Sequence, residues 1–175
     1  MVFEDAPITL RPIEEADLET LAEFVNMCWR VSYADILDAG YLSRLTTQTR
    51  LENLRAKWAR GVRGHLVLGL EDALWGVLMW GPTHLHATEN AGEITMIYLA
   101  PGHTGTGLGR RLLRVAEAAL IEDGYSNVEL DVFQGNHGAV RFYHDNGYAK
   151  VGTKQDNFEG RIYELDIMAK PLSSS

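Results

Sequence analysis

The sequence predicts an α/β protein built on one mixed sheet of six to seven strands with helices on both faces. Short segments of alternating apolar residues are separated by stretches in which apolar residues recur at helical spacing, in the order β-α-α-β-β-β-α-β-α-β-β. The 175 residues suit one domain, and 46% apolar residues is ordinary for a globular fold. We expect a single domain over residues 1–171 and a disordered tail over 172–175, where three serines end the sequence.

Each element follows from its local pattern. In the first half we expect a strand over 8–11, helices over 14–29 and 41–60, and strands over 65–70 and 74–80. The Glu71-Asp72 turn between the last two strands favours an antiparallel hairpin. In the second half we expect a strand over 93–99, a helix over 106–122, a strand over 127–133, a helix over 137–146 and strands over 148–153 and 161–169.

Charge and cysteine content narrow the class of partner. A net charge of −8 argues against nucleic acid and favours a cationic small molecule. The single cysteine, Cys28, lies in a helical pattern and is expected to be a buried apolar side chain. The first residues lack the basic and apolar regions of a signal peptide, and the longest apolar run, 73–81, is too short to span a bilayer. We therefore expect a cytoplasmic protein without a membrane partner.

A glycine-rich turn stands between a strand that ends at Pro101 and an amphipathic helix. Gly105, Gly107 and Gly109 permit backbone conformations closed to residues with a Cβ, so consecutive N–H groups can converge on one phosphate-like group. The helix dipole adds attraction for an anion. A dinucleotide fingerprint would need glycine where Arg110 stands, and the GK[ST] ending of a P-loop is absent. The turn therefore predicts an anion cradle of another kind.

Two motifs in this part of the chain carry a family resemblance. The segment 104–109, TGTGLG, resembles the [QR]-x-x-G-x-[GA] pyrophosphate loop of the general-control-related N-acetyltransferase (GNAT) superfamily, with Thr104 at the usual Gln or Arg position. The segment 136–148, NHGAVRFYHDNGY, resembles the superfamily's N-x-x-A-x-x-[FL]-Y-x-x-x-G-[FY] element, in the expected order and spacing. The resemblance extends roughly from residue 8 to residue 168. It implies a mostly antiparallel GNAT sheet and acetyl-CoA as co-substrate.

The resemblance also implies roles for individual residues. Tyr143 would be the general acid, because a phenol with a pKa of about 10 is protonated at neutral pH and can donate to a leaving thiolate. Glu93 would be the base that takes the proton of the amine, directly or through water; the alternative is that the proton leaves through water without a dedicated residue. Arg110, Arg111 and Arg114 flank the cradle, and we expect at least one of them to face the coenzyme phosphates and the others to form a solvated helix face. The coenzyme-binding residues would be Ile97, Leu99, Thr104, Gly105, Thr106, Gly107, Leu108, Gly109, Arg110, Asn136 and Tyr143, with Ile97 and Leu99 acting through their backbone.

The acceptor site is expected between the first two helical regions. The run W-x3-Y-x2-I-L-x3-Y-L from Trp29 resembles that of a bacterial subgroup that includes spermidine/spermine acetyltransferases. Trp29, Tyr33 and Asp35, with Asp38 nearby, could hold a cationic amine, although the two aromatic residues could equally join the helices as core. His84 and His86 lie two residues apart without a third ligand at a suitable spacing, so we expect no metal.

These observations favour an N-acetyltransferase that transfers an acetyl group from acetyl-CoA to the primary amine of a small molecule, polyamine-like or otherwise cationic, by direct attack in a ternary complex. An antibiotic or amino-acid N-acetyltransferase and a protein N-terminal acetyltransferase are alternatives, and a non-catalytic acyl-CoA-binding sensor is an alternative of another class. The presence of Tyr143 favours an enzyme over a sensor. A homodimer is left open.

Overall fold

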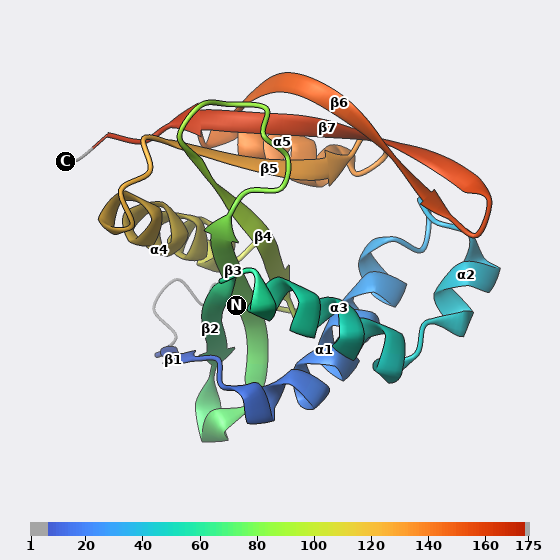
Figure 1. Ribbon diagram of the computed structural model, residues 1–175. Coiled ribbons are helices and arrows are strands. Elements are labelled where there is room, and N and C mark those ends of the chain that lie inside the picture. Colours follow the sequence, from blue (N-terminus) through green and yellow to red (C-terminus); the bar gives the residue numbers. More distant parts are fainter. Residues whose placement is uncertain (1–6, 174–175) are drawn as a thin grey trace.

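The computed structural model describes residues 7–173 and contains a seven-stranded sheet in the order β1-β2-β3-β4-β5-β7-β6 (Figure 1). The strands are β1 (Thr9–Pro12), β2 (Arg63–Leu68), β3 (Leu74–Pro82), β4 (Ala91–Leu99), β5 (Asn127–Phe133), β6 (Ala149–Phe158) and β7 (Arg161–Pro171). The helices are α1 (Leu18–Ser32), α2 (Ala39–Arg44), α3 (Thr47–Ala59), α4 (Leu108–Glu122) and α5 (His137–Asp145), with 3₁₀ turns at Glu15–Asp17 and Leu70–Asp72.

The predicted fold class is confirmed. Among the strands of residues 7–173, β4 and β5 pair in parallel and all the other pairs are antiparallel. The single helix expected over 41–60 is wrong, because two helices occupy this region. Leu45 and Thr46 have extended backbones, and the Thr46 side chain accepts a hydrogen bond from Thr49 N at 3.2 Å, which starts α3 as a new helix.

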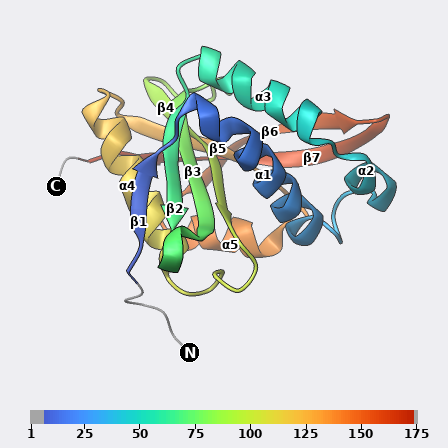
Figure 2. The same ribbon diagram turned by 90° about the horizontal axis from the view of Figure 1, so that it is seen from below.

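Helices cover both faces of the sheet with separate apolar cores (Figure 2). The core under α1 and α3 takes Met96 and Tyr98 from β4, whereas the core under α4 takes Ile94, Ile97 and Leu99 from the same strand. Ile94 and Met96 thus point to opposite faces of the sheet although they are two residues apart. The reason is a β-bulge: β4 has one extra residue, Thr95, between the pairs Met79↔Met96 and Trp80↔Ile94.

The parallel pairing of β4 with β5 is short, and this shapes the molecule. It covers only Ala91, Gly92 and Glu93 on β4, opposite Asn127, Val128 and Glu129 on β5. Beyond Glu93 the two strands diverge, which Figure 1 shows as an opening wedge. The backbone groups of β4 that face this wedge therefore lack a strand partner on the β5 side.

The end of the described part of the chain is anchored by a backbone hydrogen bond. Leu172 is held by its backbone N–H, which donates to Ser126 O at 2.9 Å, while residues 174–175 of the expected tail lie outside the described part. Among the helices formed by residues 7–173, none combines the length and the apolar character that a bilayer crossing requires.

Helix α4 is fixed to strand β7 by a buried polar network. The Tyr148 hydroxyl donates to Glu117 Oε1 at 2.9 Å, and Lys170 Nζ lies 3.0 and 3.1 Å from the two carboxylate oxygens of Glu117. Tyr148 is 1% exposed. This network ties the middle of α4 to β7 and so supports the glycine turn from which α4 begins.

We predict that Tyr148→Phe lowers the free energy of unfolding by about 1.5 kcal/mol, because a buried hydrogen bond to a charged group is lost while Lys170 still pairs with Glu117. Tyr125→Phe is the matched control, since no hydrogen bond of its hydroxyl is seen within residues 7–173, and it should change stability by less than about 0.5 kcal/mol. Denaturant titration of both variants measures the difference. Equal losses would show that the Tyr148 contact contributes nothing.

Candidate active site

A cavity of about 900 Å³ occupies the wedge between β4 and β5. Three parts of the chain form its walls: the divergent half of β4, the glycine turn with the first turns of α4, and the start of α5. Its lining residues include Tyr33, Ile94, Thr95, Met96, Ile97, Tyr98, Leu99, Thr104, Gly105, Thr106, Gly107, Gly109, Arg110, Arg111, Arg114, Val132, Asn136, Phe142 and Tyr143. The structure thus brings the two sequence motifs together around one space.

The glycine turn has the backbone geometry that an anion cradle needs. Gly105 and Gly107 have φ values of 73° and 84°, which a residue with a Cβ adopts only with strain. Gly107 is the N-cap of α4 and provides no side chain to bond the first N–H groups of the helix. These N–H groups are therefore available to an anion, and the helix dipole favours negative charge at the same place.

The side chains around the turn divide into three groups. Arg110, Arg111 and Arg114 are exposed and line the cavity. Thr104 is exposed at its edge, whereas Leu108 is buried in the core, so Leu108 can act only through its backbone. The Thr106 hydroxyl donates to His103 O at 2.8 Å, and this bond closes the turn from within.

We predict that Gly107→Ala weakens acetyl-CoA binding by about tenfold or more, because a left-handed alanine costs roughly 1–2 kcal/mol and its methyl group crowds the anion. Gly102→Ala is the matched control: its φ is 92°, so the strain is similar, but Gly102 does not line the cavity. Calorimetric titration of both variants measures the affinity. Equal affinities would exclude the cradle as the binding site.

The opposite wall of the cavity offers backbone and amide groups. Ile97 and Leu99 lie on the part of β4 that has no β5 partner, and both line the cavity. The Leu99 carbonyl is approached from α1 by Cys28 Sγ at 3.7 Å. Burial raises the pKa of the Cys28 thiol to about 11, so this side chain stays protonated, and its predicted burial is confirmed. Asn136 caps α5 by accepting a hydrogen bond from Ala139 N at 3.2 Å and also lines the cavity.

Tyr143 projects from α5 into the cavity wall beside two other tyrosines. Burial raises the pKa of its hydroxyl, and the nearby Tyr98 and Asp131 raise it further, so the phenol is protonated at neutral pH. The hydroxyls of Tyr98 and Tyr33 lie 3.4 Å apart, and the Trp29 indole donates to Tyr98 at 3.1 Å. Within residues 7–173, no hydrogen bond occupies the Tyr143 hydroxyl, which leaves it free to donate to a bound group.

The expected acceptor residues have different surroundings. Trp29 and Tyr33 pack edge to face at 5.1 Å and both contact Phe133, so they form an aromatic wall, and Tyr33 also faces the cavity. Asp35 is exposed outside the cavity wall. Asp38 caps α2, accepting from Tyr41 N at 2.9 Å, and its other oxygen pairs with an arginine of β7.

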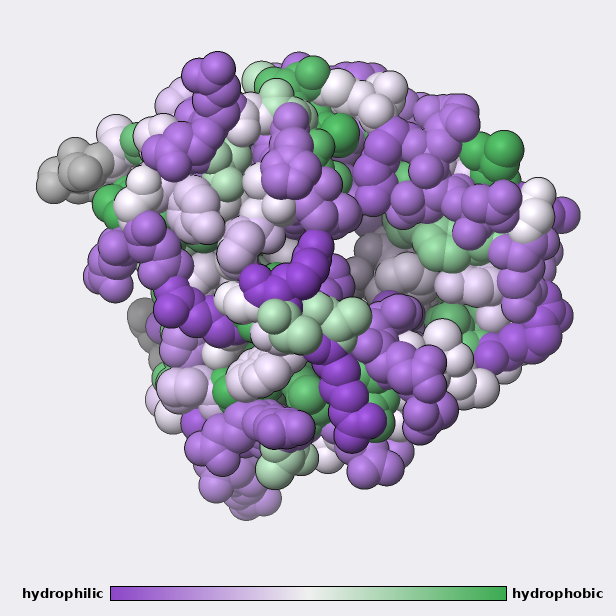
Figure 3. All heavy atoms as spheres, viewed as in Figure 1, coloured by the Kyte–Doolittle hydropathy of each residue, from purple (hydrophilic) through white to green (hydrophobic). Residues whose placement is uncertain are grey.

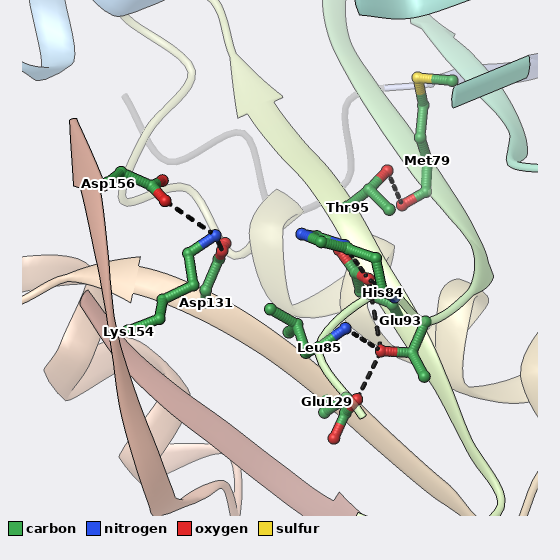
Figure 4. Close-up of polar contacts among 10 residues, drawn as sticks. Met79, His84, Leu85, Glu93, Thr95, Glu129, Asp131, Lys154 and Asp156 are labelled. Atoms are coloured by element: carbon green, nitrogen blue, oxygen red, sulfur yellow. Dashed lines mark hydrogen bonds and ion pairs between the residues drawn. The ribbon is translucent and has the colours of Figure 1, made fainter. Parts of the chain in front are cut away.

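Glu93 lies in a buried polar cluster at the point where β4 and β5 part (Figure 4). Its Oε2 accepts from His84 N at 2.9 Å and lies 2.7 Å from His84 Nδ1. Thr83 donates to Glu129, which is opposite Glu93, and its hydroxyl lies 3.4 Å from Glu93 Oε2. Burial alone would raise the pKa of Glu93, but the hydrogen bonds from His84 outweigh burial and hold this pKa below its ordinary value. Glu93 is therefore ionised at neutral pH.

A second polar cluster lies further along β5. Lys154 Nζ is 2.5 Å from Asp131 Oδ2 and 3.3 Å from Asp156 Oδ1 (Figure 4). Together with Glu93 and Glu129, these carboxylates give the sheet an acidic floor below α3. Figure 3 shows this side of the molecule hollowed between α3 and the β5–β7 strands. Glu93 and Glu129 are 2% and 0% exposed, so the accessible carboxylates of this floor are Asp131 and Asp156, which pair with Lys154.

Tyr98, Glu129, Asp131 and His84 were not expected from the sequence to be part of a site. A usable signal existed for two of them, because Glu129 and Asp131 alternate on one face of the predicted strand 127–133. His84 was recognised only as one of two histidines without a third ligand. Within residues 7–173, no group of three or more His, Cys, Asp or Glu side chains is arranged so that it could hold a metal ion.

Comparison with known proteins assigns the family. Residues 29–148 match the profile of the acetyltransferase (GNAT) family, which covers more than half of the chain. The chain belongs to this family and is an N-acetyltransferase.

Several relatives span most of the chain. The spermidine N(1)-acetyltransferase of Thermoplasma acidophilum is 28% identical over 152 residues, covering 86% of this chain and 94% of the relative. The N-acetyltransferase YuaI of Bacillus subtilis, described as uncharacterized, is 27% identical, covering 87% and 85%. The crystal structure of PaiA N-acetyltransferase from Thermoplasma acidophilum with coenzyme A is 24% identical, with a TM-score of 0.66 over 94% of this chain and 99% of that one.

Proposed function

We propose that this enzyme transfers the acetyl group of acetyl-CoA to the primary amine of a small molecule, polyamine-like or otherwise cationic, by direct attack in a ternary complex. The observation that carries the proposal is the wedge between β4 and β5, where the glycine cradle, the free edge of β4 and the Tyr143 hydroxyl face one cavity. Coenzyme A is bound in the PaiA structure, which has the same fold. The spermidine acetyltransferase relative and the acidic floor support a cationic acceptor.

Each part of the wedge has a distinct task. The turn at 105–110 would hold the pyrophosphate, and the backbone of Ile97 and Leu99 would bond the amides of the pantetheine arm as an added strand does. The amine nitrogen attacks the thioester carbonyl carbon, and the C–S bond then breaks. The Tyr143 hydroxyl, which is protonated at neutral pH, gives its proton to the leaving sulfur as the C–S bond breaks.

We predict that Tyr143→Phe lowers kcat by about 10²–10⁴-fold and leaves the affinity for acetyl-CoA unchanged, because only the proton donor is removed. Tyr125→Phe, which removes a phenol hydroxyl outside the cavity, should keep full activity. Coenzyme A release measures kcat, and calorimetry measures binding. An unchanged kcat in Tyr143→Phe would return this residue to a packing role.

The base is proposed to be Glu93, acting through water. Its carboxylate is ionised at neutral pH. Glu93 is not one of the residues that line the cavity, so a water molecule must connect its carboxylate with the amine. His84 is 40% exposed and bonds the same oxygen, which gives the proton a path from Glu93 to solvent. The ammonium loses one proton through Glu93 to solvent before the attack, and the thiolate gains one from Tyr143. The second proton, released from nitrogen as the amide forms, returns through water to the Tyr143 phenolate, so one proton is released per turnover.

We predict that kcat/KM rises from about pH 6 to about pH 9, because an amine with a pKa of about 10.4 is mostly protonated at neutral pH. The pKa of Glu93 lies below this range, so its own titration does not contribute to the rise. Glu93→Gln should lose most activity near pH 6, where the fraction of free amine is smallest and deprotonation by a base matters most. The control Glu89→Gln, at an exposed loop position, should follow the pH profile of the parent enzyme. A parallel profile for Glu93→Gln would assign proton removal to water alone.

A further inference from the structure

One buried cation is not explained by the proposed chemistry. Arg50 projects from α3 and is 8% exposed. Its Cζ lies 4.1 Å from the centroid of the Trp29 ring, and its Nε donates to Asn26 Oδ1 at 3.0 Å. Burying an ionised group is costly unless it is paired with an opposite charge. Arg50 has an aromatic face and an amide as neighbours instead of a carboxylate.

The terminal nitrogens of Arg50 have no partner within the described part of the chain. Among residues 7–173 no ion pair includes Arg50, and no hydrogen bond uses Nη1 or Nη2. Within residues 7–173, the buried side-chain nitrogen and oxygen atoms that lack a hydrogen bond are His65 Nδ1, Trp80 Nε1 and Glu129 Oε2. Nη1 and Nη2 of Arg50 are not among these atoms, so both remain in contact with solvent. The forked end of the guanidinium thus keeps some contact with solvent and has its N–H groups unused, as pairing with a planar anion requires.

The position of Arg50 relates it to the reaction site. Burial lowers the pKa of Arg50, and Tyr98, Tyr41 and Tyr33 lie close enough to oppose that shift. Contacts connect the two places: the Trp29 ring that Arg50 covers donates to the Tyr98 hydroxyl, which lies 3.4 Å from that of Tyr33. Tyr33 and Tyr98 line the same cavity as Tyr143, so Arg50 lies one aromatic ring away from the wall of that cavity.

We propose that Arg50 binds a carboxylate of the acceptor, so that the preferred acceptor is an amino acid or similar molecule with a primary amine and a carboxylate. This inference rests on the proposed function and narrows its substrate class. The amine end lies at the thioester, where water connects it with Glu93, and the carboxylate end forms a bidentate pair with Arg50. A polyamine has no anionic group and leaves Arg50 unpaired.

The test compares acids with their own amides. Coenzyme A release is measured with α-amino acids and with ω-amino acids of increasing chain length, each paired with its carboxamide, and with spermidine. The parent should prefer the acid of at least one pair by about tenfold or more in kcat/KM, as the loss of a hydrogen-bonded charge partner implies. The ω-series reports the distance between the amine and the carboxylate.

Three variants assign the preference to Arg50. Arg50→Met should raise KM for the acid and remove the preference, and Arg50→Lys, which keeps the charge without the fork, should restore part of it. Arg55→Met, an exposed arginine of the same helix, should behave as the parent. Acetyl-CoA titration of each variant confirms that it is folded.

Each outcome decides a different claim. Turnover of amides or spermidine in preference to every acid, in the parent itself, would overturn the carboxylate site and leave the acetyltransferase proposal intact. An acid preference that survives Arg50→Met would also overturn the role of Arg50. Release of coenzyme A with no member of the panel, by protein that binds acetyl-CoA, would contradict the proposed small-molecule function and the inference with it.

Discussion

The short parallel ladder between β4 and β5 is the constraint on which the site depends. Three residues of each strand pair, and the strands then separate, so a free strand edge and a cavity of about 900 Å³ arise in the middle of a continuous sheet. The extra residue at Thr95 turns Met96 and Tyr98 toward α1 and α3 while Ile97 and Leu99 face α4. One strand thereby contributes side chains to the cores on both faces of the sheet.

Much of this arrangement was predictable from local patterns. The strand before the glycine turn, the turn itself and the helix after it were expected in order, because glycine spacing and helical periodicity are local properties. The capping role of Asn136 was also visible in the sequence, since an N-cap depends only on the next few residues. The break at Leu45 and Thr46 was missed although the sequence carries a signal for it, because no apolar residue lies between Leu45 and Leu51 and threonine is a common N-cap.

The remainder of the site depends on contacts between distant segments. Glu93 was expected at a strand edge, yet it is 2% exposed, because β5 and the loop after β3 cover it. Arg50 lies in a helix whose sequence resembles an ordinary charged surface, and only the packing of α3 on Trp29 buries it. Such positions follow from tertiary structure, which periodicity does not encode. The cytoplasmic location and the assembly of the chain stay predictions.

Amide hydrogen exchange with and without acetyl-CoA tests the central claim most directly, namely that the coenzyme binds in the wedge between β4 and β5. Exchange should slow in the divergent half of β4, 96–99, and in the glycine turn, 105–110, because bound acetyl-CoA would occupy both sets of N–H groups. The edge strand β6 serves as the internal reference and should not change. Slower exchange confined to β6 or to the outer surface of α3, with 96–99 and 105–110 unaffected, would contradict the claim.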